Sequence, residues 1–211
     1  NWLEALIPQA LFRTMNQGIM MEQSSHLTEE EKILIVEFLM KQHRSDFPEE
    51  AELNYCSFDK VKFDLKEAPE PYGWGYNTSR FIPKKSGGLD SKNVSKLKLK
   101  WAFGFPYSQR ARSQPLFALG SIFVGSQSGD VYALDIETGC IKWNFTASGE
   151  VRTAIIMDEW KNGSIPSQRP YLYFGDIIGN AYAIDAQNGE LIWKIKANNH
   201  PNSTLTAAPA I

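Results

Sequence analysis

A repeat dominates this sequence. The stretch from Gly125 to Trp143 matches the stretch from Gly175 to Trp193 when one is shifted by 50 residues. The two copies share Gly, Gly, Tyr, Ala, Asp, Gly and Trp at the same spacing. A period of this length indicates a supersecondary unit that buries its hydrophobic faces only against neighbouring copies. The repeat therefore predicts a stacked architecture.

Each copy is expected to form short strands, because runs rich in β-branched and aromatic residues are bounded by Gly, Asp or Asn. The expected strands are 121–124, 131–134 and 141–145 in the first copy and 171–174, 181–184 and 191–195 in the second. Fourth strands are expected at 114–118 and 151–157, and 205–211 would begin a third unit. Four strands per period predict a mainly β fold built of β-propeller blades. About two blades would be complete, in repeats 112–145 and 151–195.

The repeated polar and glycine residues are expected to form turns. Asp135 and Asp185 can accept hydrogen bonds from backbone N–H groups of the turns that they open. Gly139 and Gly189 suit positions of positive φ, which a side chain would make costly. These residues are therefore explained by structure rather than by catalysis.

The repeated tryptophan is expected to pack between units. A large apolar ring at one fixed place in each copy, Trp143 and Trp193, suits a contact with the neighbouring repeat. Trp101 would close a preceding unit in the same way.

Composition excludes some function classes. The 211 residues carry a net charge of −2, so nothing electrostatic favours nucleic acid. No apolar run approaches the ~18 residues that a membrane span needs. Cys56 and Cys140 allow one disulfide, but nothing in the sequence places them together, so paired and free thiols both stay open. The chain opens without an initiator Met, and we expect it to be a fragment.

Residues 1–45 differ from the rest because they show helical periodicity and no repeat. Thr28 and Glu31 form a capping box, and Ile33, Val36 and Met40 then share one helix face. A second helix is expected from Pro8 to Met15, ending before Gly18. Residues 46–72 are interpreted as an acidic, Pro-rich linker, and 73–211 as the first part of the propeller.

The Gly18-Ile19-Met20-Met21 loop, followed by a terminal amphipathic helix, resembles the second half of a c-type cytochrome. The resemblance implies that Met20 is the axial ligand of the haem iron, with Met21 as the rival. The alternative is that both side chains fill an apolar core. The haem c attachment sequence Cys-x-x-Cys-His is absent, so it would have to lie upstream of this chain.

The entry to the repeats carries a second resemblance. The residues Gly73-Trp74-Gly75, Asn77 and Arg80-Phe81, with the blade signature Ala-x-Asp-x-x-x-Gly-x-x-x-Trp, resemble quinoprotein dehydrogenases, which use pyrroloquinoline quinone (PQQ). The order of a cytochrome-like segment and then this propeller looks most like the polyvinyl-alcohol dehydrogenases.

This resemblance implies a periplasmic oxidoreductase. PQQ would take two electrons from an alcohol substrate, a polymeric or secondary alcohol among them, and pass them through haem c to an acceptor cytochrome. Ca²⁺ would act as a Lewis acid on the quinone, and a carboxylate, to which the sequence assigns no residue, would be the general base.

PQQ carries three carboxylates, which the planar fork of Arg suits. Arg112 and Arg152 occupy similar places at the starts of the innermost strands, which line the central channel of a propeller. We therefore predict that they face the cofactor, with Gln114 and Thr153 as neutral partners. The alternative is that each Arg forms a weak ion pair at a solvated rim. Asp176 could approach a metal, but a role in its turn explains it better.

A second class of function shares the repeat. Propeller scaffolds of the outer-membrane assembly type have the same blades without binding the quinone. The cytochrome-like segment and the Arg pair favour the enzyme over this alternative.

Overall fold

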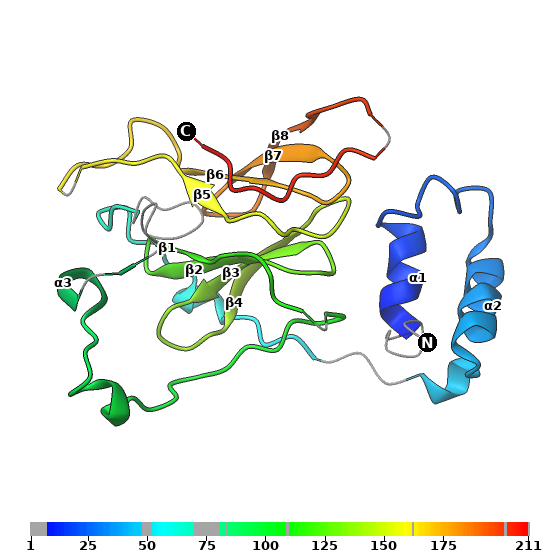
Figure 1. Cartoon of the computed structure of the whole chain (residues 1–211), viewed down its shortest axis with the longest axis horizontal. Helices are drawn as coiled ribbons and strands as arrows, with labels where there is room; N and C mark the ends of the chain where they lie inside the picture. The colour runs from blue at the N-terminus through cyan, green and yellow to red at the C-terminus, as the bar shows by residue number, and fades with distance from the viewer. Residues whose placement is uncertain are drawn as a thin grey trace.

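The computed structural model describes residues 8–47, 52–69, 81–82, 84–108, 110–161, 163–200 and 202–210. These residues form two four-stranded antiparallel sheets, each with its strands in sequence order. The first sheet contains β1 (Leu116–Ala118), β2 (Ser121–Gly125), β3 (Asp130–Asp135) and β4 (Ile141–Thr146). The second contains β5 (Ile156–Met157), β6 (Tyr171–Gly175), β7 (Asn180–Asp185) and β8 (Leu191–Lys196). We call these sheets blade 1 and blade 2; they lie one above the other in Figure 1.

The blades confirm the predicted mainly β, propeller-type fold. The six strands expected inside the two copies are present, and both blades share one register, with Ala133 opposite Trp143 and Ala183 opposite Trp193. Strand β5 is shorter than the expected 151–157. The N–H of Val151 bonds to blade 1 instead of to β6, so the inner segment of blade 2 also ties the two blades together.

Both predicted turn devices are present. The Asp135 carboxylate accepts hydrogen bonds from the Glu137 and Thr138 N–H groups at 3.1 and 2.9 Å. Gly139 and Gly189 both have a φ of 73°, as their positions require.

Trp143 packs across the blade boundary, as predicted. The Trp143 indole N–H donates to the Ala186 carbonyl at 3.0 Å, and a Cβ added at Gly189 would lie 2.8 Å from the ring. Trp101 makes the same contact one blade earlier, against the Gly139 turn. Trp193 is 43% exposed on β8.

Leu205, where we predict the start of a third unit, repeats a backbone contact of Val151. Its N–H donates to the Asp176 carbonyl at 3.2 Å, just as Val151 N–H donates to the Ser126 carbonyl at 3.0 Å. Its side chain also lies over Gly175, where a Cβ would leave no room. No strand forms within 202–210.

Residues 52–69, part of the predicted linker, run along blade 1. Cys56 and Cys140 form a disulfide, which settles the question left open by the sequence. Beside it, the Ile141 N–H donates to the Asn54 carbonyl at 2.8 Å. The buried Lys142 ammonium donates to the Lys62 carbonyl at 2.7 Å. This segment, the strap, is therefore fastened to the edge of the blade.

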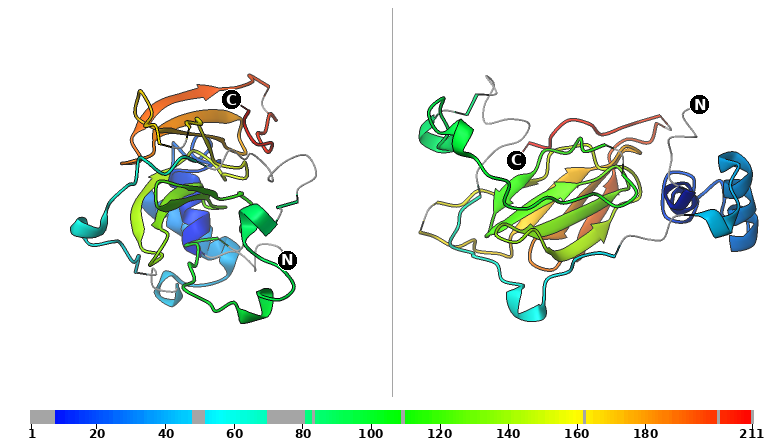
Figure 2. Two further views of the ribbon diagram at one scale, coloured as in Figure 1. Left: turned by 90° about the vertical axis from the view of Figure 1, so that its left-hand side faces the viewer. Right: turned by 90° about the horizontal axis from the view of Figure 1, so that it is seen from below.

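The N-terminal part is helical, as predicted. Helix α1 spans Pro8–Asn16 and α2 spans Glu29–Met40. The capping box is present, with the Glu31 N–H donating to Thr28 and the Thr28 N–H donating to the Glu31 carboxylate. The two helices lie at one end of the strands (Figure 2).

The predicted face of α2 is buried at Val36 and half-buried at Ile33 and Met40. Leu34 and Phe38, outside that face, are exposed. Among the described residues, no helix is long and apolar enough to cross a membrane. Shorter elements complete the described chain: η2 (Arg44–Asp46), η3 (Phe58–Lys60), α3 (Lys84–Gly87) and η4 (Val94–Lys96).

Candidate functional site

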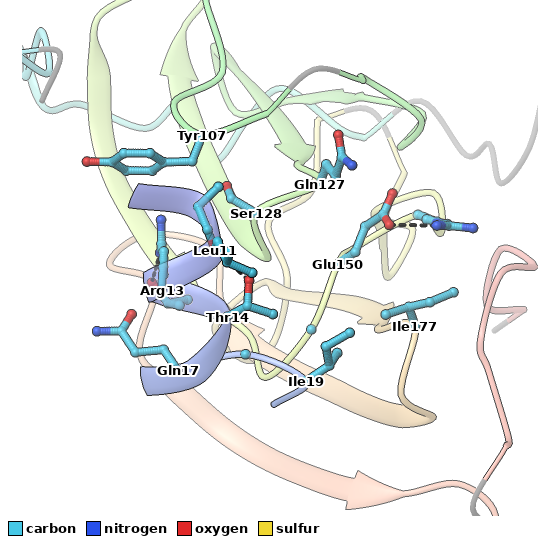
Figure 3. A pocket seen from close by; sticks show the side chains of 15 residues that line it. Leu11, Arg13, Thr14, Gln17, Ile19, Tyr107, Gln127, Ser128, Glu150 and Ile177 are labelled. Atoms are coloured by element: carbon cyan, nitrogen blue, oxygen red, sulfur yellow. Dashed lines mark hydrogen bonds and ion pairs between the residues drawn. The ribbon is translucent and has the colours of Figure 1, made fainter. Parts of the chain in front are cut away.

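A cavity of about 260 Å³ lies between α1 and the two blades (Figure 3). Its walls come from three parts of the chain: the helix and the loop after it, the segment before blade 1, and the turns of both blades. The lining includes Leu11, Arg13, Thr14, Gln17, Ile19, Tyr107, Gln127, Ser128, Thr146, Glu150, Arg152 and Ile177. The cavity therefore brings the helical segment and the seam between the blades into one site.

Arg13 forms the helix side of the site. Its Nη1 donates to Asp130 Oδ2 at 2.6 Å, and its Nη2 donates to Asp130 Oδ1, so the pair is bidentate. Nη2 also donates to the Thr146 hydroxyl at 3.1 Å. The guanidinium carbon lies 5.7 Å from the centre of the Tyr107 ring, within cation–π range.

Asp130 lies deep in blade 1, with 2% of its side chain exposed. Its carboxylate also accepts hydrogen bonds from the Ser128, Tyr132 and Thr146 hydroxyls. Burial, together with the Asp130 charge, raises the pKa of Tyr132. The Tyr132 hydroxyl is therefore held as a donor to Asp130.

The blade side of the site holds the pair Glu150 and Arg152. Arg152 Nη2 donates to Glu150 Oε2 at 2.7 Å, a contact drawn in Figure 3, and this bond raises the pKa of Arg152. Its Nε is buried and has no partner among the described residues. Arg152 thus forms the ion pair of the alternative interpretation, while its buried Nε–H has no acceptor among the described residues.

The two predicted Arg residues do occupy equivalent places. Each is followed by a hydroxyl residue, Ser113 or Thr153, that accepts a hydrogen bond from a strand-end glycine. Gly125 N–H donates to Ser113 at 3.2 Å, and Gly175 N–H donates to Thr153 at 3.0 Å. The Thr153 hydroxyl is therefore already bonded to its own blade.

The structure does not bring Arg112 to this cavity. Arg112 is half-buried and, within the described part of the chain, has no ion-pair partner. Gln114 is also half-buried, and its carbonyl accepts a bond from Ile155 N–H at 3.3 Å. The assignment of these residues to a cofactor stays a prediction.

Met20 follows Ile19 directly, but its side chain does not line the cavity. Met20 and Met21 are 43% and 48% exposed, so neither fills a core of the described residues. Whether Met20 binds haem iron stays a prediction. The entry motif Gly73-Trp74-Gly75, with Asn77 and Arg80, lies outside the described residues.

The Asp176 carboxylate stabilises the turn in which it lies. The carboxylate accepts hydrogen bonds from the N–H groups of Ile178 and Asn180, from the Asn180 amide and from the Tyr182 hydroxyl. In the described residues, no group of three or more His, Cys, Asp or Glu side chains could hold a metal.

The sequence did not reveal Arg13, Asp130 or Glu150 as site residues. The one available signal was Asp130, since the other copy has Asn180 at that place. Arg13 is 117 residues from its partner, and nothing local in the sequence links them.

Comparison with known proteins agrees with the repeat. The model of a family described as outer membrane protein assembly factor BamB matches residues 92–161. A polyvinylalcohol dehydrogenase of Pseudomonas sp is 33% identical over 156 residues, which are 73% of this chain and 24% of the relative. The polyvinylalcohol dehydrogenase of Sphingopyxis sp. (strain 113P3) is 32% identical over 154 residues, 72% of this chain and 23% of the relative.

Among solved structures, a europium-containing methanol dehydrogenase is 26% identical with a TM-score of 0.42, covering 58% of this chain and 22% of that one. The chain spans about a quarter of the length of the curated relatives that it matches. The family match covers the whole of blade 1, and the relatives include polyvinylalcohol dehydrogenases and a quinoprotein ethanol dehydrogenase. The chain is thus a PQQ-repeat, β-propeller protein related to the PQQ-dependent quinoprotein alcohol dehydrogenases.

Proposed function

We propose that this chain supplies two propeller blades and a helical segment to a larger PQQ-dependent dehydrogenase that oxidises an alcohol. The observation that carries the proposal is the similarity to two polyvinylalcohol dehydrogenases over more than 70% of the chain. Their names point to a polymeric or secondary alcohol as substrate. Electrons would leave the quinone through a haem c to an acceptor cytochrome.

Two guanidinium groups fit a cofactor with three carboxylates. Arg112 has no ion-pair partner among the described residues, and Arg152 keeps a buried Nε without an acceptor. PQQ would supply the two-electron chemistry when bound. The role that we assign to Arg112 and Arg152 is to bind and orient its carboxylates, because a charge-assisted Arg–carboxylate bond is strong and directional. Glu150 would have to give up part of its bond to Arg152.

The described residues fit the other groups less well. Cys56 and Cys140 are joined to each other, so neither is free to attach a haem. Any haem c would be attached by another part of the protein, with Met20 as its proposed axial ligand. We assign no Ca²⁺ ligand in this chain, since the described residues hold no carboxylate cluster that would bind the ion.

The disulfide supports a periplasmic location for the protein. Disulfides persist in oxidising compartments and are rare where glutathione keeps thiols reduced. When intact cells are treated with a thiol-reactive reagent, Cys56 and Cys140 should stay unmodified, because both are joined in the disulfide. Modification of both residues in the native protein would count against the periplasm.

The direct test uses the full-length protein. Purified without quinone, it should regain alcohol-dependent dye reduction when PQQ and Ca²⁺ are added, with polyvinyl alcohol and 2-propanol compared as substrates. Arg152→Ala should weaken PQQ reconstitution, whereas Arg169→Ala, which breaks an ion pair on blade 2, should not. A folded protein that binds no quinone would refute the proposal.

The haem ligand has its own readout. Met20→Ala should lower the reduction potential of the haem, because a thioether ligand raises it. If only Met21→Ala lowers the potential, Met21 is the ligand.

A second candidate is a non-enzymatic scaffold, favoured by the description of the family model that matches residues 92–161. It predicts no quinone binding and a stable association with outer-membrane assembly proteins. The reconstitution experiment separates the two candidates, since a scaffold gives no dye reduction at any PQQ concentration.

A further inference from the structure

The two blades satisfy a buried carboxylate in different ways. Blade 2 has Asp176 and Asn180 where blade 1 has Ser126 and Asp130. All the donors described for the Asp176 carboxylate come from its own hairpin, including the Asn180 amide at 2.8 Å and the Tyr182 hydroxyl at 2.7 Å. The negative charge of Asp176 is therefore stabilised by donors from its own hairpin alone.

In blade 1 the carboxylate has moved four positions along the hairpin. Ser126 now accepts the hydrogen bond of the Asp130 N–H at 3.0 Å, as Asp176 does for Asn180 in blade 2. The displaced Asp130 carboxylate has three hydroxyl donors in its own blade, but its cationic partner, Arg13, comes from α1.

The free energy of this arrangement depends on Arg13. The Asp130 carboxylate is 2% exposed, and the donors described for it besides Arg13 are hydroxyls, without the backbone N–H and amide donors that bind Asp176. Losing one partner of such a buried ion pair is strongly destabilising. The bidentate fork, the extra bond to Thr146 and the ring of Tyr107 fix where the guanidinium lies. Blade 1 thus has a site that a helix carrying one Arg can occupy, and blade 2 does not.

A second contact lies one turn beyond the helix. Gly149, at the seam of the blades, would with a Cβ come within 3.4 Å of the Ile19 side chain and 3.3 Å of Ile177 and Ile178. The Ile19 side chain therefore lies against Gly149, in the connection between the blades. The helical segment contacts the propeller at two points, Asp130 in blade 1 and Gly149 at the seam.

We propose that Arg13 and Asp130 are the docking contact that fixes the helical segment on the propeller. Arg13 is a positioning residue, because it sets the place of the Gly18–Met21 loop beside Glu150 and Arg152. Helix α2 is held to α1 and should dock with it, because Lys32 donates to Asn16 at 2.7 Å and Ser24 donates to the Met15 carbonyl at 2.7 Å. The proposal does not depend on the quinone or the haem, because neither Arg13 nor Asp130 is assigned to them.

The sequence of blade 2 suggests a variant of blade 1 that lacks the docking site but keeps hydrogen-bond partners for its buried polar groups. Ser126→Asp combined with Asp130→Asn gives blade 1 the residue pair of blade 2. The new carboxylate should be bound within its own hairpin, as Asp176 is, so the blade should fold. Arg13→Gln removes the same contact from the helix side, and Arg13→Lys keeps the charge but loses the bidentate fork.

The readout is the distance between nitroxide labels at Glu30→Cys on α2 and Glu190→Cys on blade 2, measured by pulsed electron resonance on the oxidised protein. Both sites are exposed. Arg169→Gln is the matched control: it breaks the 3.1 Å pair with the buried Asp185, which lies within blade 2.

The parent protein and Arg169→Gln should give one narrow distance distribution. Arg13→Gln and the exchanged pair should broaden it, because losing charged hydrogen bonds lowers the ratio of docked to undocked protein by about 10- to 100-fold. Arg13→Lys should fall between. An unchanged narrow distribution in both Arg13→Gln and the exchanged pair would overturn the proposal, as would equal broadening in Arg169→Gln.

Discussion

Trp143 and Trp193 occupy the same repeat position, but only Trp143 is covered by a following blade. Trp143 is 7% exposed and donates a hydrogen bond to the Ala186 carbonyl, whereas Trp193 is 43% exposed. Trp143→Ala and Trp193→Ala therefore remove the same side chain from the same repeat position, once where it is buried and once where it is partly exposed. The pair tests whether the stacking of blades, rather than the strands themselves, holds this chain together.

The magnitudes follow from the exposed fractions. A fully buried Trp removes up to ~250 Å² from water, worth about 6 kcal/mol at ~25 cal/mol per Å², and measured Trp→Ala losses are about 3–5 kcal/mol. Trp143→Ala should lower the free energy of unfolding by about 4–5 kcal/mol, since it also leaves the Ala186 carbonyl unpaired. Trp193→Ala should cost about 2 kcal/mol because nearly half of the ring is already in water.

Urea unfolding followed by far-ultraviolet circular dichroism measures both values. The two variants keep the same number of tryptophans, so the matched comparison is between them as well as with the parent. Losses of equal size, or a loss below about 1 kcal/mol for Trp143→Ala, would show that the rings do not join the blades.

Three further predictions use the same assay. Gly189→Ala should destabilise the protein by more than about 2 kcal/mol, because φ is +73° and the new Cβ would lie 2.8 Å from Trp143. Gly163→Ala is the control: φ is +85° but nothing lies within 4 Å of the new Cβ, so it should cost only about 1 kcal/mol of backbone strain. Equal costs would contradict this account of the turn. Replacing both Cys56 and Cys140 with Ala should cost about 4–5 kcal/mol, since the disulfide closes a loop with a sequence separation of 84, and dithiothreitol should then destabilise only the parent. Burial acts to raise the pKa of Asp135, but hydrogen bonds from Thr138 and the charge of Lys142 outweigh it and lower that pKa overall. The stability that the Asp135 carboxylate contributes is therefore present above its unfolded pKa of about 4 and is lost as pH falls through the lowered folded value. The loss of stability caused by Asp135→Asn should shrink below about pH 4, and a loss independent of pH would contradict the assignment.

Much of the fold could be predicted because its determinants are local and repeated. Six strands followed from alternation and turn residues, and the Gly139 turn and the capping box at Thr28 followed from single residues with defined backbone needs. The short β5 was not predicted, because the Val151 N–H bonds to blade 1, a choice that strand propensity does not contain.

The contacts that assemble the site could not be predicted, since they join distant segments. Cys56 meets Cys140 across 84 residues, and Arg13 meets Asp130 across 117. A local pattern shows that Asp130 differs from Asn180, but not which cation approaches it. The predicted Arg112 and Arg152 proved equivalent in the repeat, yet only Arg152 lines the cavity.

The central claim is that this propeller binds a quinone through the Arg residues that precede its inner strands. The most direct measurement is a PQQ titration of the full-length protein carrying Arg112→Ala or, as the matched control, Arg110→Ala in the same segment. Arg112→Ala should weaken quinone binding by about 10- to 100-fold, the loss of one charge-assisted pair, while the exposed Arg110 should be replaceable without effect. Unchanged affinity in both Arg112→Ala and Arg152→Ala would contradict the claim.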